Sequence, residues 1–162
     1  MSTDGGFRFC FFGSVLGVTG LRRLAGYRRA LTAAGIEIDE SLICQGNFDG
    51  ESGMQAAEKL LKSSRSFSAL FASNDMMAFG ARLVFSRHGI RAPEDISIIG
   101  FDDQAESAFC TPPLTTAKQP ACEMGQAAAD ALVKLIGGTE YQMPKLPTEI
   151  VIRESTLSLS GN

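Results

Sequence analysis

Carboxylate and amide side chains follow two apolar segments of this 162-residue chain, at the points where those segments end. Asn74 and Asp75 come shortly after Ala-Leu-Phe-Ala, and Asp102 and Asp103 come directly after Ile-Ser-Ile-Ile-Gly-Phe. Short, almost fully apolar strands are typical of parallel sheets that are covered on both faces. Because such sheets bind ligands in the loops at the carboxyl ends of their strands, these four residues predict a site for a polar small molecule.

The elements that must position these residues alternate between strand and helix. Apolar residues at helical spacing from Leu21 to Leu31 predict a first helix, with Gly35 at its C-terminal end. Such alternation at short spacing indicates an α/β fold with a doubly wound parallel sheet. Strands are expected at residues 7–12, 42–45, 69–72 and 96–101, and two further helices at 52–62 and 76–88.

The last third of the chain departs from this alternation. Two prolines interrupt the segment 111–116, and a long helix is predicted over 121–136, ended by a pair of glycines. A proline-spaced linker at 141–147 and a terminal strand at 149–153 follow. The apolar stripe expected on the long helix consists of Met124, Ala128, Ala131 and Leu135.

Composition narrows the function classes. The net charge of −3 gives no basic footprint for direct binding of nucleic acid, and no apolar run reaches the length of a membrane span. One histidine and four widely spaced cysteines argue against a metal site, and no cofactor is expected. Cys10 and Cys44 lie in apolar runs and are expected to be buried thiols. These features favour a cytoplasmic protein without membrane contact.

Short motifs occur in a fixed order along most of the chain. They are Arg23-Leu-Ala-Gly-Tyr27 with Ala30-Leu31, Gly46-Asn-Phe48, Ala72-Ser-Asn-Asp-Met-Met-Ala-Phe-Gly80, Gly89-Ile-Arg-Ala-Pro-Glu-Asp-Ile-Ser-Ile-Ile-Gly-Phe-Asp-Asp103, Pro113-Leu-Thr-Thr116, Gln119-Pro120, Gly125 with Ala128, and Arg153-Glu-Ser-Thr156. As an ordered set they resemble the effector-binding core of the lactose/galactose-repressor family of bacterial transcription regulators. That core shares its fold with periplasmic sugar-binding proteins.

The resemblance implies one lobe of a periplasmic-binding-protein-like core, in which an effector binds between two lobes and their closure controls DNA binding. It places the C-terminal lobe at residues 7–116, a crossing helix and linker of the other lobe at 117–147, and a return strand at 148–157, with tails at 1–6 and 158–162. The headpiece and most of the N-terminal lobe of the family have no counterpart here. We therefore expect contact with DNA only through a headpiece that is absent from this sequence.

The resemblance assigns ligand binding to Arg23 and Asp102. From position alone, Arg23 is equally compatible with a solvated helix residue, and Asp102 with a helix cap. In the family, the matching arginine binds the ligand through its guanidinium fork, and the matching aspartate accepts hydrogen bonds from the effector. The adjacent Asp103 is expected to be a cap or a hinge contact.

Three further residues are expected to bind ligand. Asn74 could cap the following helix, but its amide can also donate and accept at once, and ligand binding is preferred; for Asp75 the structural role is preferred. Phe48 could simply pack on the sheet edge, whereas in the family an aromatic residue at this position can stack on the ligand. Thr19, in a glycine-rich turn, could add a hydroxyl contact.

The predicted helix 76–88 is apolar on two faces, which indicates that both are buried. One face packs on the sheet. The other face, with Met76, Phe79 and Leu83, either sinks between the sheet and neighbouring loops or forms a subunit interface. The resemblance favours the interface, and hence a homodimer.

The leading hypothesis is the ligand-sensing and dimerisation part of a transcription regulator, with a small polar effector that we expect to be a sugar. A periplasmic-type sugar-binding protein is the alternative within the same fold. A sugar- or nucleoside-processing enzyme is a weaker alternative. Its acid–base chemistry could use Asp75, Asp102 and Asp103, but the sequence has no placed histidine, nucleophile motif or metal cluster.

Overall fold

A six-stranded sheet organises the computed structural model, which describes residues 8–14 and 17–157. The strands lie side by side in the order β2-β1-β3-β4-β5-β6. Neighbouring strands are parallel except β6, which runs antiparallel to β5. The strands are β1 (Phe9–Gly13), β2 (Ile43–Gln45), β3 (Ala69–Ala72), β4 (Ser97–Asp102), β5 (Thr115–Lys118) and β6 (Glu149–Val151).

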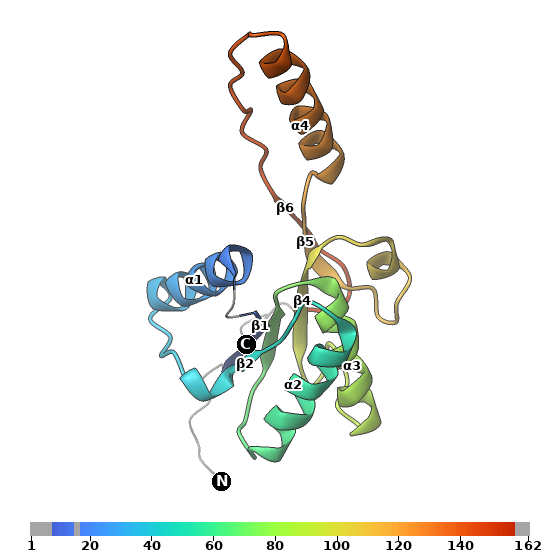
Figure 1. Cartoon of the computed structure of the whole chain (residues 1–162). Coiled ribbons are helices and arrows are strands. Elements are labelled where there is room, and N and C mark those ends of the chain that lie inside the picture. Colours follow the sequence, from blue (N-terminus) through green and yellow to red (C-terminus); the bar gives the residue numbers. More distant parts are fainter. Residues whose placement is uncertain (1–7, 15–16, 158–162) are drawn as a thin grey trace.

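Helices cover both faces of the sheet, which confirms the doubly wound α/β fold (Figure 1). α1 (Val18–Ala33) lies on one face, and α2 (Gly50–Lys62) and α3 (Asp75–Arg87) lie together on the other. Side chains of β1 alternate between these faces, as the pleat of a strand requires. Phe11 packs with Leu24 and Tyr27 of α1, whereas Cys10 and Phe12 belong to the core beneath α2 and α3.

The helix pair α2–α3 is closely packed because glycines lie at its contact. A side chain at Gly80 would meet the carbonyl oxygen of Gly50 at 2.0 Å, and one at Gly53 would meet that of Met77 at 2.3 Å. The main core lies beneath this pair, and its largest fully buried members are Phe12, Leu42, Leu60, Leu70, Met77, Val84, Phe85, Ile96, Ile98 and Leu114. The predicted burial of Cys10 and Cys44 is confirmed, and neither forms a disulfide.

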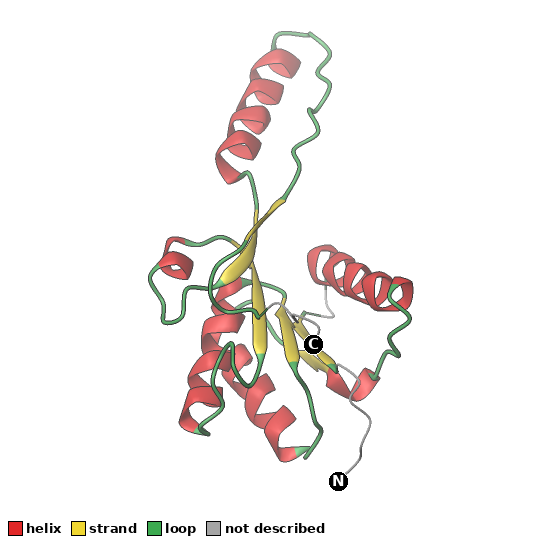
Figure 2. Cartoon of the chain, turned by 180° about the vertical axis from the view of Figure 1, so that it is seen from behind, coloured by secondary structure: helices red, strands yellow, loops and turns green. Residues whose placement is uncertain are grey.

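Beyond β5 the chain leaves this compact part and forms a projecting arm (Figures 1 and 2). We call residues 119–148 the arm and the other described residues the lobe. The arm contains α4 (Ala121–Ile136) and an extended segment that returns to β6. Ala127 is the one buried residue of α4. None of the helices in residues 8–14 and 17–157 is long and apolar enough to cross a membrane.

The predicted elements match the observed ones to within three residues at each end, with two corrections. β3 and α4 have the predicted bounds. Leu42 belongs to a short 3-10 helix (Glu40–Leu42) and precedes β2, instead of beginning the strand. The proline-containing segment 111–116, expected only to break the alternation, leads directly into β5. Phe7 and the predicted tails 1–6 and 158–162 lie outside the described residues.

A buried serine holds β5 in the sheet. The Ser155 hydroxyl accepts a hydrogen bond from the backbone N–H of Thr115 at 2.8 Å and donates one to the carbonyl oxygen of Ile98 at 2.6 Å. The segment that follows β6 therefore joins β4 and β5 at the end of the sheet that is remote from the arm.

Candidate functional site

The structure brings together four of the five residues that are predicted to bind ligand. Asp102 is the last residue of β4, and Asn74 lies between β3 and α3. Arg23 comes from α1, and Phe48 from the turn between β2 and α2. All four therefore belong to segments that leave the carboxyl ends of parallel strands, where open α/β sheets bind their ligands.

The Arg23 guanidinium is fixed from three sides. One terminal nitrogen donates to the carbonyl oxygen of Ser73, and the other lies 3.3 Å from Oδ1 of Asp102. Its central carbon is 3.8 Å from the ring centroid of Phe101 and 5.7 Å from that of Phe48. With 12% of its side chain exposed, Arg23 is a positioned hydrogen-bond donor at the carboxyl ends of the strands, and it is not a solvated arginine of the helix surface.

One carboxylate oxygen of Asp102 accepts hydrogen bonds from neighbouring side chains, and the other accepts none from the described residues. Oδ1 accepts from Arg23 and from the side-chain amide of Gln119, whose nitrogen is 2.5 Å away. Within the described residues, no donor contacts Oδ2. The backbone of Asp102 has a φ of 114°, which is uncommon for a residue with a side chain. Asp102 thus combines a strained backbone with one carboxylate oxygen that receives no donor from the described residues.

Burial opposes the charge on both members of this ion pair. Burial raises the pKa of Asp102 above its ordinary range, although the hydrogen bond from Gln119 and the charge of Arg23 oppose the rise. Burial also lowers the pKa of Arg23, against the effect of Asp102. A ligand that donates to the carboxylate and accepts from the guanidinium would stabilise both charged forms.

Asn74 caps α3 and also holds the Phe48 turn. Its Oδ1 accepts from the backbone N–H of Met77 at 3.0 Å, and its Nδ2 donates to the carbonyl oxygen of Phe48 at 2.7 Å. Phe48 has a φ of 64°, so this contact fixes a turn that an aromatic residue seldom adopts. Asn74 is buried, with 5% of the residue exposed, so contact between its second Nδ2 proton and a ligand stays a prediction.

Asp75 is fully buried next to these residues, and its carboxylate links three segments of the lobe. Its carboxylate accepts from the backbone N–H of Gln104 at 2.8 Å, from the Ser107 hydroxyl at 2.7 Å and from the Thr116 hydroxyl at 2.6 Å. A side chain at Gly100 would lie 2.2 Å from the same carboxylate. The structural role expected for Asp75 is confirmed, because these bonds join α3, β5 and the loop that follows β4.

Asp103 is a structural contact on the far side of the same loop. Its carboxylate pairs with Arg153 at 2.6 Å, and Arg153 also donates to the carbonyl oxygen of Leu114 at 2.8 Å. Asp103 itself has a φ of 58°. Asp103 does not cap the following 3-10 helix, whose N-cap is Gln104. The ion pair instead joins the loop after β4 to the segment after β6, and a hinge role stays a prediction. Asp102 faces the cluster with Arg23.

The predicted location of Thr19 was wrong. It lies in the first turn of α1 and not in the glycine-rich turn before the helix. It precedes Arg23 by four residues, so both lie on the same face of α1, and its side chain is exposed. Contact between Thr19 and a ligand stays a prediction.

Gln119 and Phe101 belong to the cluster, although sequence reasoning gave them no role. Gln119 follows β5, and this strand was not recognised because Thr-Thr-Ala-Lys has no apolar run. Had the strand been recognised, the rule about carboxyl ends would have placed Gln119 beside Asp102. In the described part of the chain, no group of three or more acidic, histidine or cysteine side chains is placed to hold a metal ion.

The helix face predicted to form a subunit interface is partly exposed. Met76 and Leu83 are 39% and 45% exposed, and Phe79 is half-buried. The opposite residues of α3, among them Met77 and Val84, are fully buried against the sheet and α2. The expected division of α3 into two apolar faces is therefore present, and one face is available to a partner.

The chain is an α/β lobe with a cluster of Arg23, Phe48, Asn74 and Asp102 at the carboxyl ends of its parallel strands. The periplasmic binding protein-like domain matches residues 6–156. The chain therefore belongs to that family.

The relatives are transcription regulators and not enzymes. The regulator CelR of Thermobifida fusca is 41% identical over 140 residues, which cover 85% of this chain and 41% of CelR. The regulator AscG of Escherichia coli K12 is 39% identical over 145 residues, which cover 90% of this chain and 43% of AscG. The chain thus spans about two-fifths of the length of these relatives.

Solved structures of such regulators share the fold. A complex of CelR with cellobiose has a TM-score of 0.86 and 38% identity, over 93% of this chain and 47% of that one. A lac repressor dimer bound to operator has a TM-score of 0.87 and 32% identity, over 95% of this chain and 54% of that one. The resemblance inferred from the motifs is confirmed.

Proposed function

We propose that this chain is the effector-sensing and dimerisation part of a bacterial transcription regulator. It binds a small polar effector, a sugar, and the bound state controls DNA binding by a helix-turn-helix headpiece that the described residues do not include. Arg23, Phe48, Asn74, Asp102 and Thr19 provide this lobe's wall of the effector site. The observation that carries the proposal is the Arg23–Asp102 pair at the strand ends, with Oδ2 of Asp102 open.

The chemistry of the cluster fits a sugar. Sugar hydroxyls donate and accept hydrogen bonds, so one hydroxyl can donate to Oδ2 of Asp102 while a neighbouring one accepts from Arg23. Phe48 adds a flat apolar surface beside the guanidinium, against which the C–H face of a pyranose ring can pack. Such a mixture of few polar groups and aromatic surface is typical of small-molecule sites.

The relatives support the regulatory part of the proposal. CelR and AscG are both helix-turn-helix-type regulators, and the structure of CelR contains cellobiose. By analogy the effector lies between this lobe and a second one, and the arm packs against that second lobe. Effector binding would then shift the population of lobe arrangements, which is how one site influences another. Such a regulator would act in the cytoplasm.

The exposed face of α3 supports a homodimer. Met76, Phe79 and Leu83 form a continuous apolar surface on a helix whose other face is already buried. The lac repressor, a structural relative, is a dimer in its complex with operator. We propose that two copies of this chain meet through this face of α3.

A periplasmic-type sugar-binding protein would have the same fold, and it would use the same cluster. The relatives favour the regulator, because those reported above are regulators and match across most of this chain.

The test is an NMR titration of the 162-residue chain with monosaccharides and disaccharides, cellobiose included. Amide signals of residues 46–49, 73–75, 101–103 and 119 should shift with at least one sugar. Asp102→Asn should weaken that binding at least about tenfold, because a hydrogen bond to a charged acceptor is lost. The exposed, remote Asp95→Asn is the matched control and should bind as the parent does. Equal affinity in Asp102→Asn, or shifts confined to other regions, would contradict the proposal.

A further inference from the structure

The arm is joined to the lobe through two neighbouring strands, β5 and β6 (Figures 1 and 2). Their ladder ends at Lys118 opposite Glu149, and the arm begins with the next residue, Gln119. Residues at the ends of such elements are where one part of a protein can hinge against another. Contacts across this joint therefore decide how firmly the arm is held on the lobe.

Gln119 makes a hydrogen bond across this joint. Its side-chain amide nitrogen is 2.5 Å from Oδ1 of Asp102, and the residue is half-buried. Among the side chains of the arm, it is the one that hydrogen-bonds to the lobe within residues 8–14 and 17–157. The first residue of the arm is thus bonded to a carboxylate of the effector cluster.

The backbone of Asp102 directs its carboxylate towards Gln119. In the register of β4 and β5, Lys118 lies opposite Asp102. The carboxylate nevertheless pairs with Arg23 and accepts from Gln119. Asp102 reaches these partners with a φ of 114°, and such backbone strain persists where surrounding contacts hold a residue in place. Gln119 and Arg23 supply those contacts, one from the arm and one from the lobe.

Both of these bonds use Oδ1 of Asp102, so the second carboxylate oxygen stays accessible. In the described part of the chain, the one fully buried side-chain nitrogen or oxygen without a partner is Nε of Arg28. Oδ2 of Asp102 receives no donor there, and because it is not such a buried atom, solvent or a ligand can reach it. The two donors on Oδ1 therefore fix where this open oxygen lies.

We propose that Gln119 is a positioning residue, which orients the Asp102 carboxylate towards the ligand and, through the same bond, holds the arm on the lobe. This inference rests on the effector site proposed above, to which Asp102 belongs. Because a single hydrogen bond serves both purposes, a change at the carboxylate alters how the arm is held, and reorientation of the arm alters the carboxylate. Gln119 thereby links the effector site to the exposed apolar helix of the arm.

Carboxyl carbon NMR of the full chain tests the bond without any effector. Burial raises the pKa of Asp102, and the hydrogen bond from Gln119 opposes that rise. Gln119→Leu should therefore raise this pKa above that of the parent, whereas Gln119→Lys should lower it, because a nearby positive charge favours the carboxylate. The exposed Gln142→Leu in the arm is the matched control and should leave it unchanged. Loss of packing alone would not give shifts of opposite sign, and equal pKa values in Gln119→Leu and the parent would overturn the proposal.

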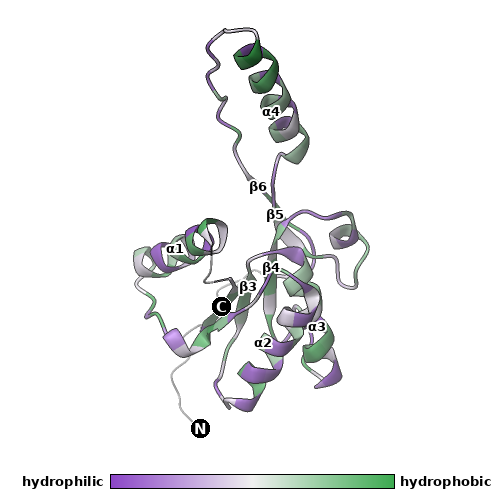
Figure 3. Cartoon of the chain, viewed as in Figure 1, coloured by the Kyte–Doolittle hydropathy of each residue, from purple (hydrophilic) through white to green (hydrophobic). Residues whose placement is uncertain are grey.

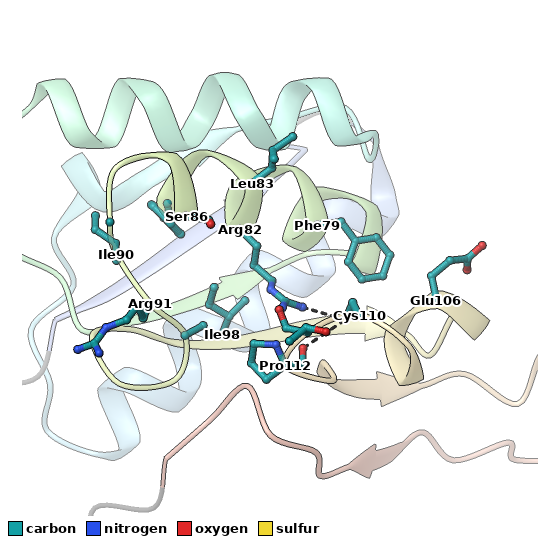
Figure 4. Close-up of a pocket in the computed structure, with 14 residues that line it drawn as sticks. Phe79, Arg82, Leu83, Ser86, Ile90, Arg91, Ile98, Glu106, Cys110 and Pro112 are labelled. Carbon is teal, nitrogen blue, oxygen red and sulfur yellow. Dashed lines mark hydrogen bonds between the residues drawn. The ribbon is translucent and has the colours of Figure 1, made fainter.

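The hold on the arm is measured by the distance between two spin labels, one on the lobe and one on the arm. Glu58→Cys on α2 and Glu140→Cys after α4 provide exposed sites for the labels. The exposed Cys122 is replaced by serine. Cys110 is also replaced by serine, which can still accept from Arg82 as the cysteine sulfur does (Figure 4). Two buried thiols remain unlabelled: Cys10 and Cys44.

The parent should give a narrow distribution of distances between the labels, and Gln119→Leu should broaden it, because the bond across the joint is lost. Gln119→Lys should restore the narrow distribution, and Gln142→Leu should match the parent. Dilution with unlabelled chain restricts the signal to distances within one chain. Equal widths in the parent and Gln119→Leu would overturn the proposal. Neither experiment needs a sugar, so failure here is distinct from failure of sugar binding.

Discussion

The lobe and the arm are built from similar helices, but only the lobe buries them. In the lobe, α2 places Ala57 and Leu60 against the sheet, where both are essentially inaccessible to solvent. In the arm, α4 carries Leu132 and Leu135 at 61% and 63% exposure. In Figure 3 much of the projecting helix is coloured as hydrophobic. An amphipathic pattern thus predicts a helix in both regions, but it does not identify what the helix packs against.

The lobe and the arm also differ in how far their polar side chains are hydrogen-bonded. In the lobe, Asp75, Asp102 and Asp103 each have named partners that join neighbouring strands and loops. In the arm, Gln119 at its base donates to Asp102 of the lobe. Beyond Gln119 the described side chains of the arm form no comparable network, apart from a contact between the ammonium of Lys134 and the ring of Tyr141 at 5.1 Å. The lobe is thus held together by polar contacts between its strands and loops, whereas the arm leaves an apolar helix surface exposed.

The largest expected difference concerns leucines on helices of the two regions. Leu60→Ala in α2 should lower the free energy of unfolding by about 2–5 kcal/mol, because it opens a cavity in the core. Leu132→Ala in α4 should change it by no more than about 0.5 kcal/mol, because that side chain is mostly exposed. Urea denaturation followed by circular dichroism measures both. Similar losses in the two variants would show that α4 packs on the lobe.

A second pair compares carboxylates. Asp75→Asn should destabilise the chain by about 1.5–3 kcal/mol, because an amide cannot accept all three hydrogen bonds and leaves a buried donor without a partner. Asp130→Asn, on the exposed surface of α4, should have almost no effect. Urea denaturation followed by circular dichroism measures the free energy of unfolding of both variants. An Asp75→Asn variant as stable as the parent would contradict the structural role of the Asp75 hydrogen bonds.

A third pair asks which exposed apolar surface associates with a second copy. Leu83→Glu on α3 should raise the dissociation constant of the dimer at least about tenfold, because a charge would have to be buried at the interface. Leu132→Glu on α4 should leave it unchanged. Sedimentation equilibrium measures both constants. The reverse result would assign self-association to the arm, and a monomeric parent would exclude the proposed dimer of this chain.

The smallest expected effect is a dependence of binding on pH. Because burial raises the pKa of Asp102, this carboxylate takes up a proton at a pH above the ordinary value of 3.8. Sugar affinity should be full above the raised pKa and decline as the pH falls through it. Asp95 is the internal control, since its hydrogen bond with Arg91 lowers its pKa and it stays charged at lower pH. Carboxyl carbon NMR shifts follow both groups, and protonation of Asp95 before Asp102 would contradict the assignment.

The sequence allowed most of the lobe to be predicted, since local signals agree there with the fold. The apolar run of β3 and the capping residue Asn74 mark the junction where α3 begins. β5 was missed because Thr115 and Thr116 are buried through hydrogen bonds instead of through apolar side chains. Those partners, Ser155 and Asp75, are about 40 residues distant in the chain, so no local pattern reveals them.

Most residues of the candidate site could be predicted, but its geometry could not. Position at strand ends selected four polar residues together, and the motif resemblance then singled out Asp102 and Arg23. The engagement of one oxygen of Asp102 by Gln119, and the packing of Arg23 over Phe101, depend on side-chain placement across four strands.

Hydrogen exchange of the full chain, with and without a saturating sugar, is the most direct test of the effector site. We expect added protection in peptides that cover residues 46–49, 73–75, 101–103 and 119, and none in α4 (Ala121–Ile136). Protection centred on α4 would contradict the assignment of effector binding to the Arg23–Asp102 cluster.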